Sequence, residues 1–229
     1  MSIRSRCKRR LRRAAAVVTA GCLVGLVAGC GMSGGKLLFA SGLFQPKKVE
    51  ARFRLTKNPI LILVDDPRER VDWPVFSRLL TDDLAQELLR NEAAAKIVPI
   101  QTLQSIQQTE TRYAERGARE IGELAGAEQV LWIEVQDFLV QEEVEAIDEA
   151  AYAVVSVRVL NVLEKNKYKV RVFPDNPQGE IVSVQLTSSE VSRAKTKDAI
   201  AKELSARLSL KIGRYFYDYR PEDFEGEAP

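Results

Sequence analysis

The pattern of apolar and polar residues predicts a strand followed by a helix at the start of a folded domain. Residues 60–64 form a continuous apolar run that ends at the turn-forming sequence Asp65-Asp66-Pro67, which predicts a strand covered on both faces. Asp72-Trp73-Pro74 then supplies a capping residue and a proline suited to a first helical turn. The apolar residues that follow have helical spacing: Phe76, Leu79, Leu80, Leu84 and Leu88.

The later pattern predicts further strands and two more helical regions. Residues 96–100 predict a short second strand, and Thr102 begins a helical region that reaches Leu124 with a break at 112–117. Residues 131–139 and 153–163 alternate as strands do, and a strand pair follows at 168–173 and 181–186. The last helix starts at about Ala194 and has one apolar stripe: Ile200, Leu204, Leu208, Ile212 and Tyr215. This order predicts an α/β (α+β) fold over residues 58–220, with a single mixed sheet packed by about three helices.

The first 29 residues have the layout of a secretory signal peptide. Seven basic residues and no acidic one precede Ala14–Gly29, which carries no charge. A retained membrane-spanning helix is the alternative, but this run is shorter than the roughly 20 apolar residues that a bilayer core requires. We therefore expect a cleaved leader.

The residues Leu26-Val27-Ala28-Gly29-Cys30 resemble the lipobox of bacterial lipoproteins. The resemblance implies cleavage after Gly29, a diacylglycerol on the Cys30 thiol and an acylated new amino terminus. Thr19-Ala20-Gly21-Cys22 is a weaker rival because its apolar run is too short. Two or three acyl chains anchor a protein durably, whereas one chain does not. Residues 30–57 then form a Gly/Ser-rich and basic tether. Because Gly31 rather than aspartate follows Cys30, the lipoprotein pattern implies the periplasmic face of the outer membrane rather than the inner membrane.

Composition excludes several classes of function. Removal of the leader leaves 27 basic and 32 acidic residues, a net charge of −5, so we expect no nucleic-acid partner. The chain has no histidine, which excludes histidine-based catalysis and the usual zinc or copper ligand sets. We expect no metal and no cofactor beyond the covalent lipid on Cys30. That cysteine would also be the only one in the processed chain, so no disulfide within one chain is possible.

Two segments resemble a group of bacterial envelope domains. They are "LLTDDLAQELLRNEAAAKIVPIQTLQSI" (residues 79–106) and "REIGELAGAEQVLWIEV" (residues 119–135). The group contains the penicillin-binding-protein activator lipoproteins, the periplasmic domain of the curli-secretion lipoprotein and the amino-terminal domain of the Tol-system translocation protein. The resemblance implies a noncatalytic domain that binds other envelope proteins. Channel-forming members carry long amphipathic hairpins. The corresponding hairpin here, residues 140–151, is short and acidic, so we do not expect a pore.

Two pairs of adjacent carboxylates are the candidates for catalysis. Asp65-Asp66 follows the first predicted strand, at the end where active sites of open sheets lie. Neighbouring side chains on a strand point to opposite faces, so this pair is poorly placed to act on one substrate atom. Asp82-Asp83 lies on the first predicted helix. Acidic residues after a strand commonly form turns, and those on a helix commonly lie on its exposed surface. We therefore expect no enzyme.

Aromatic residues are the candidates for contact with a partner, because aromatic side chains are enriched at interface hot spots. Trp73 precedes the first predicted helix, Trp132 lies opposite the core positions of its strand, and Tyr217 follows the last apolar stripe. We expect Tyr215 and Tyr219 to pack inward instead. The acidic tail, residues 221–229, has the composition of a disordered segment.

Two hypotheses follow from these observations. The first is a lipid-anchored periplasmic protein that binds or helps assemble other envelope proteins. The second is an auxiliary lipoprotein of an envelope transporter that carries a lipid or small molecule in a cleft. A large apolar pocket would favour the second hypothesis. The sequence does not specify the partner or the oligomeric state.

Overall fold

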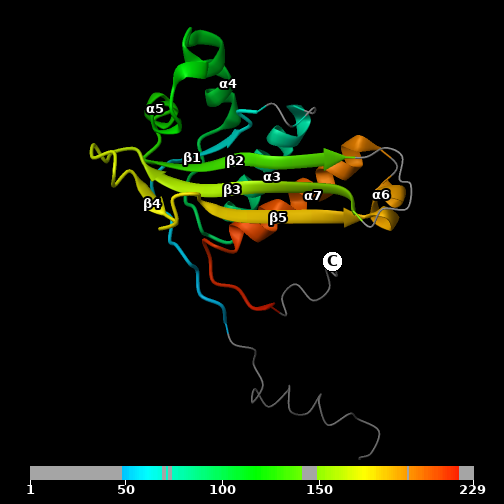
Figure 1. The fold of residues 1–229 in the computed structure, drawn as a ribbon. Helices are drawn as coiled ribbons and strands as arrows, with labels where there is room; N and C mark the ends of the chain where they lie inside the picture. Colours follow the sequence, from blue (N-terminus) through cyan, green and yellow to red (C-terminus); the bar gives the residue numbers. More distant parts are fainter. Residues whose placement is uncertain (1–47, 69–70, 72–73, 141–148, 195, 222–229) are drawn as a thin grey trace, which may run out of the picture. The chain divides into compact units, whose positions relative to one another are not determined.

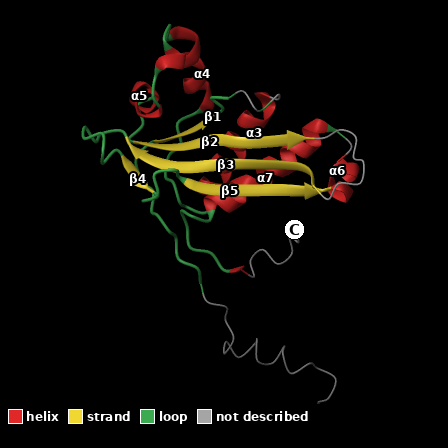
Figure 2. Ribbon diagram, viewed as in Figure 1, coloured by secondary structure: helices red, strands yellow, loops and turns green. Residues whose placement is uncertain are grey.

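The computed structural model describes residues 48–68, 71, 74–140, 149–194 and 196–221. In these ranges the chain forms a five-stranded mixed sheet packed by helices, which confirms the predicted fold class (Figures 1 and 2). The leader with Gly29 and Cys30, most of the tether, Trp73 and residues 222–229 lie outside the described residues.

Three long strands and two shorter ones form the sheet. Strand β1 (Ile60–Asp65) pairs in parallel with β2 (Gln129–Val140), which pairs antiparallel with β3 (Glu149–Asn161). Both β4 (Arg171–Phe173) and β5 (Glu180–Thr187) pair antiparallel with β3, at different positions along it. Strand β5 is therefore at the edge of the sheet opposite β1.

Helices α3 (Pro74–Arg90) and α7 (Lys197–Gly213) lie together behind the sheet in Figure 1. The second predicted helical region is divided into α4 (Ile100–Thr109), a single 3₁₀ turn η1 (Tyr113–Glu115) and α5 (Ala118–Leu124), with the break where the sequence predicts it. A short helix that the sequence pattern does not predict, α6 (Ser188–Ala194), precedes α7. Helix α7 begins where the Thr196 side chain accepts a hydrogen bond from the Ala199 N–H (3.2 Å).

The larger hydrophobic core lies between the sheet and these two helices. Alternate residues of β3 and β5 point into it, as their period-2 sequence pattern requires. The side chains that α3 contributes are fully buried: Phe76, Leu80, Leu84 and Leu88. Helix α7 contributes a matching stripe: Ile200, Ala201, Leu204, Leu208 and Ile212.

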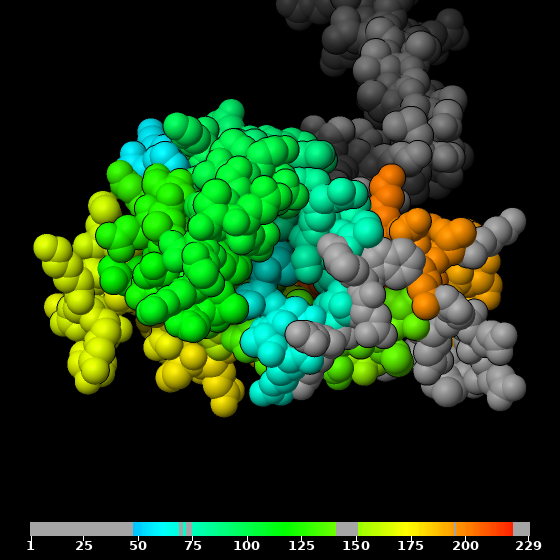
Figure 3. Space-filling model, turned by 90° about the horizontal axis from the view of Figure 1, so that it is seen from above, coloured from blue at the N-terminus to red at the C-terminus, as the bar shows by residue number. Residues whose placement is uncertain are grey.

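A smaller core lies on the opposite face of the sheet. Helices α4 and α5 place Leu103 and Ile121 against β1 and β2, where they cover Leu61, Leu63 and Val130. Figure 3, which looks onto the β1 edge, shows these helices in green as a continuous cover. The positions of this face on β5 are exposed: Ile181, Ser183, Gln185 and Thr187.

The predicted strand at residues 96–100 is wrong. Only Ile97 forms a bridge to β1: the Ile60 N–H donates to the Lys96 carbonyl oxygen (3.0 Å) and the Val98 N–H donates to that of Ile60 (2.8 Å). Pro99 follows at once, and because it has no N–H it cannot extend a ladder. It is well suited to the position before a helix, and α4 begins at Ile100.

Residues 48–57, which by composition belong to the predicted tether, pack against the domain. Val49 and Tyr219 exchange two backbone hydrogen bonds (2.8 and 3.0 Å), and the Phe53 N–H donates to the Tyr215 carbonyl oxygen (3.0 Å). The Phe53 ring lies 5.5 Å from that of Phe173 on β4. None of the helices in the described ranges is both long enough and apolar enough to span a bilayer.

Candidate functional site

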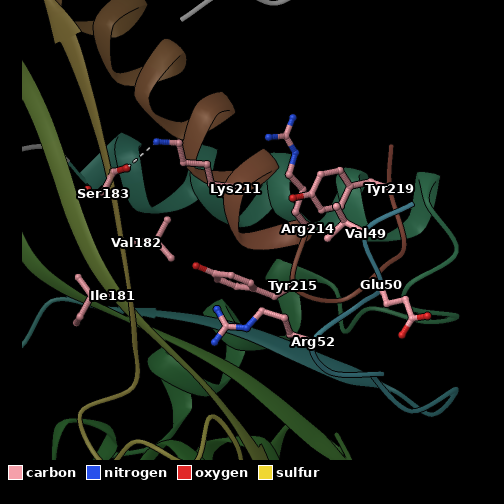
Figure 4. Close-up of a pocket in the computed structure, with 10 residues that line it drawn as sticks. All are labelled: Val49, Glu50, Arg52, Ile181, Val182, Ser183, Lys211, Arg214, Tyr215 and Tyr219. Atoms are coloured by element: carbon pink, nitrogen blue, oxygen red, sulfur yellow. Dashed lines mark hydrogen bonds between the residues drawn. The ribbon is translucent and has the colours of Figure 1, made fainter. Parts of the chain in front are cut away.

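A groove of about 360 Å³ lies between β5, the end of α7 and the N-terminal segment 48–54 (Figure 4). Strand β5 contributes Ile181, Val182 and Ser183, and the N-terminal segment contributes Val49, Glu50 and Arg52. The end of α7 and the turn after it complete the lining with Lys211, Arg214, Tyr215 and Tyr219. The groove is thus assembled from three segments that are far apart in the sequence.

Three cations and one carboxylate line the groove, which gives it a positive charge. In Figure 4 the side chains of Arg52 and Tyr215 lie side by side, whereas Glu50 points away from them. The Arg52 guanidinium carbon is 4.8 Å from the centre of the Tyr215 ring, and that of Arg214 is 5.1 Å from the centre of the Tyr219 ring. Such cation–π contacts hold the guanidinium groups in place against flat apolar surfaces.

An ion pair fixes the position of Arg52 in the groove lining. Arg52 donates two hydrogen bonds to the carboxylate of Glu180 (2.6 and 3.0 Å), the bidentate arrangement that fixes both groups. The hydrogen bond with Glu180 raises the pKa of Arg52. Burial raises the pKa of the Tyr215 hydroxyl, and the nearby charge of Glu180 acts in the same direction. Tyr215 therefore stays a neutral hydrogen-bonding group at physiological pH.

Cations from α7 also bind the edge of β5. Lys211 Nζ donates to the backbone carbonyl oxygen of Ser183 (3.0 Å), shown by the dashed line in Figure 4, and Arg207 Nη1 donates to that of Gln185 (3.4 Å). Charged side chains that occupy the carbonyl oxygens of an edge strand oppose pairing with a further strand. The ammonium of Lys211 binds the carbonyl rather than the hydroxyl of Ser183, so the two residues do not form a Ser-Lys catalytic pair.

This geometry is suited to binding rather than to proton transfer. A guanidinium is protonated at any physiological pH and cannot act as a base. Arg52 already binds the Glu180 carboxylate through its paired N–H groups, whereas the Lys211 ammonium donates to a backbone carbonyl and keeps further N–H groups for an anion. The aromatic rings add apolar contact area beside the cations. The groove is therefore able to hold an anionic group next to an apolar one. Among the described residues, no group of three or more acidic or cysteine side chains is placed to hold a metal ion.

The first carboxylate pair is separated as the strand pattern predicts. The Asp66 carboxylate accepts a hydrogen bond from the Val71 N–H (2.7 Å) and so shapes the turn after β1. Asp65 lies on the other face, beside Glu134 of the neighbouring strand β2. Burial raises the pKa of the Asp65 carboxyl, and the neighbouring charge of Glu134 adds to this effect.

The second carboxylate pair lies on α3. The Ser205 hydroxyl of α7 donates a hydrogen bond to the carboxylate of Asp83, which joins the two helices, while Asp82 is exposed. Asp83 therefore has a structural contact between α3 and α7.

Trp132 is half-buried on the outer face of the sheet. Its ring lies under the guanidinium of Arg158, whose carbon is 4.7 Å from the ring centre, and Arg158 forms an ion pair with Glu134 (2.7 Å). The indole also packs beside the smaller core. Its partner role remains a prediction, as does that of Trp73, which lies outside the described residues.

The expectation that Tyr217 faces outward is wrong. Its side chain is only 4% exposed, and its hydroxyl donates a hydrogen bond to the buried carboxylate of Glu87 on α3. Burial raises the pKa of this hydroxyl. Helix α7 ends at Gly213, so the helical phase of the apolar stripe is lost after it. Phe216 and Tyr217 consequently turn inward, whereas Tyr215 is half-buried at the groove.

Comparisons with known proteins add fold-level neighbours only. No family model matches the chain, and no curated protein matches it significantly. Solved structures that resemble it are bacterial: hypothetical protein CT253 from Chlamydia trachomatis (14% identity, 70% of this chain and 98% of that one, TM-score 0.39) and lipoprotein GNA1162 from Neisseria meningitidis (14%, 67% and 96%, TM-score 0.41). A third is the PelC dodecamer from Paraburkholderia phytofirmans (12%, 76% and 97%, TM-score 0.35). Similarity at this level carries no functional argument.

Proposed function

We propose that the protein is a noncatalytic lipoprotein on the periplasmic face of the bacterial outer membrane, and that its domain binds other envelope proteins. The lipobox-like residues 26–30 support the anchor. The groove supports the binding role, because its cations and aromatic rings are held in place by contacts within the domain. A site that is already formed loses less conformational entropy when a partner binds.

The groove is the observation that carries this proposal. Arginine and tyrosine are among the residues that contribute most to binding energy at protein interfaces. Both types line the groove, in contact with each other, and neither is placed beside a nucleophile or a base. The expected contact on the partner is an acidic residue next to an apolar side chain.

A second candidate remains, because a volume of about 360 Å³ is within the range of small-molecule sites. In that case the protein would be an auxiliary lipoprotein of an envelope transporter. The charged lining favours a small anionic molecule over the acyl chain of a lipid, since a buried acyl chain requires an apolar wall.

The anchor is tested by the intact mass of the protein purified from bacterial membranes. The proposal predicts a chain that begins at Cys30 and carries the mass of a diacylglycerol and a further acyl group. An intact leader with an unmodified Cys30 would contradict it.

The binding role is tested by crosslinking in living cells followed by quantitative mass spectrometry, with two charge reversals on α7. Lys211→Glu reverses a charge in the groove, and Lys202→Glu is the matched control on an exposed part of the same helix. We expect Lys211→Glu to reduce capture of specific envelope proteins at least about tenfold, as the loss of a charged interface contact does. Equal capture by the parent and both variants would contradict the proposal.

A further inference from the structure

A lysine-rich loop, residues 163–169 (sequence LEKNKYK), projects from the domain between β3 and β4. It extends beyond the end of the sheet in Figure 1 and forms the projecting yellow-green part of Figure 3. Its two large apolar side chains are among the most exposed in the described chain: Tyr168 is 84% exposed and Leu163 is 66% exposed. This loop is distant in sequence from the groove and plays no part in it.

The lysines of the loop are not neutralised by the domain. Lys165, Lys167 and Lys169 are all exposed, and in the described part of the chain none of them forms an ion pair with a carboxylate. Lys167 Nζ lies 5.1 Å from the centre of the Tyr168 ring. The only acidic residue of the loop is Glu164, and its carboxylate accepts a hydrogen bond from the Asn166 N–H (2.8 Å).

Local hydrogen bonds give the loop a defined shape. The Tyr168 N–H donates to Asn166 Oδ1 (3.0 Å) and the Lys169 N–H donates to the Asn166 carbonyl oxygen (2.8 Å). At its base, the Asn161 N–H donates to the Val170 carbonyl oxygen (2.7 Å). The exposed lysines, leucine and tyrosine therefore lie on a loop of defined shape that projects from the domain (Figure 1), not in a groove.

We infer that this loop contacts the surface of a bilayer that contains anionic phospholipids, with the lysines at the headgroups and Tyr168 and Leu163 at the boundary of the acyl chains. Lysine near an anionic leaflet is attracted electrostatically, and tyrosine prefers the membrane–water interface. A flat bilayer accepts a projecting loop, whereas recognition of a peptide relies on a concave groove or a sheet edge. Both the charge and the shape of the loop therefore favour contact with a bilayer surface.

This inference rests on the proposed lipid anchor, which would hold the domain near the bilayer. The 19 residues from Cys30 to Lys48 are joined by 18 Cα–Cα steps, which span at most about 65 Å when extended, so the anchor permits the loop to reach the membrane. Loop contact would add a second attachment point and would orient the domain relative to the surface.

The test uses the full chain purified from bacterial membranes and reconstituted in vesicles of phosphatidylcholine and phosphatidylglycerol with brominated acyl chains. Tyr168→Trp places a fluorophore on the loop, and Ile181→Trp places one at a position on β5 that is 52% exposed. The emission of the parent chain is subtracted from both. We expect brominated lipid to quench the added emission of Tyr168→Trp and to leave that of Ile181→Trp unchanged.

The role of the lysines is tested in the Tyr168→Trp chain by adding Lys165→Gln, Lys167→Gln and Lys169→Gln. We expect a shift of the contact equilibrium of about fivefold for each lysine, or roughly 100-fold for all three. Unquenched emission from the acylated Tyr168→Trp chain would overturn the inference, as would equal quenching in vesicles of phosphatidylcholine alone. The intact mass of the same preparation reports the acyl groups on Cys30, so failure of the anchor is distinguished from failure of the loop.

Discussion

One face of the sheet, the covered face, is packed along its length by α3 and α7. The other, the open face, is covered by α4 and α5 only near β1 and is exposed over β5. The covered face is apolar at nearly every position, and the side chains that α3 and α7 pack against it are buried. The open face carries Glu134, Arg158 and Ser183, and the groove lies at the β5 edge, between this strand and the end of α7. Stability therefore comes mainly from the first face, so the second face and the β5 edge are free to carry charged and exposed side chains suited to binding.

The largest effect is expected from Phe76→Ala on the covered face. The Phe76 side chain is fully buried and its ring lies 4.8 Å from that of Phe138, so truncation leaves a cavity. We expect a loss of about 3–5 kcal/mol in the free energy of unfolding, measured by urea denaturation. The control on the other face is Ile181→Ala, with an expected loss below about 0.5 kcal/mol. Equal losses would remove the distinction between the faces.

Tyr217→Phe tests the buried polar contact between α3 and the turn after α7. The substitution removes the hydroxyl that donates to Glu87 and leaves a buried carboxylate with one partner fewer. A Cβ on Gly213 would lie 2.8 Å from Glu87 Cγ, so the close approach of the two segments depends on this glycine. We expect a loss of about 1–3 kcal/mol in the same denaturation experiment. An unchanged free energy of unfolding would show that the hydroxyl contributes nothing to stability.

Glu190 on α6 is expected to make the free energy of unfolding depend on pH in the acidic range. The hydrogen bond from Arg207 lowers the pKa of the Glu190 carboxyl from 4.5 to about 2, and the Thr187 N–H contributes in the same direction. Because the pKa is lower in the folded state, the ionised carboxylate of Glu190 stabilises the fold at pH values above about 4.5. This stabilisation is lost as the pH falls from about 4.5 to 2. Glu190→Gln should therefore be less stable than the parent by about 0.5–1 kcal/mol at pH 6 and equal to it at pH 2. A difference that is the same at both pH values would contradict this account.

The smallest effect is expected from Asp65→Asn on the second face. Since burial raises the pKa of this carboxyl, its ionised form is less favourable in the folded state than in the unfolded state. The neutral variant should have a free energy of unfolding higher by less than about 1 kcal/mol at pH 7, and the gain should vanish at pH 3. Thermal melting at the two pH values measures it. A destabilised variant at pH 7 would show that the charge of Asp65 is required by the fold.

The sequence predicts the elements with a strong period and misses features that depend on distant segments. The alternation in β3 and β5 and the apolar stripe of α7 specify which face is buried, and the structure confirms them. Residues 96–100 have the composition of a strand, but Pro99 limits them to one bridge. The outward placement of Tyr217 extends a helical pattern past Gly213, where the helix ends, and is wrong for that reason.

The groove was not predictable from local spacing. Its lining comes from residues 49–52, 181–183 and 211–219, and no motif links these segments in the sequence. The exposed Tyr168 and its neighbouring lysines are visible in the sequence as a basic stretch. Only the structure shows that none of these lysines forms an ion pair with a carboxylate in the described part of the domain and that the loop projects from it.

Site-specific photo-crosslinking in living cells tests the central claim, that the groove is where envelope proteins bind. A photoreactive amino acid replaces Ser183 in the groove or Gln101 on the exposed surface of α4. The account predicts that position 183 captures envelope proteins that position 101 does not, and that Lys211→Glu reduces this capture at least about tenfold. The same captured proteins from both positions, or none from position 183, would contradict it.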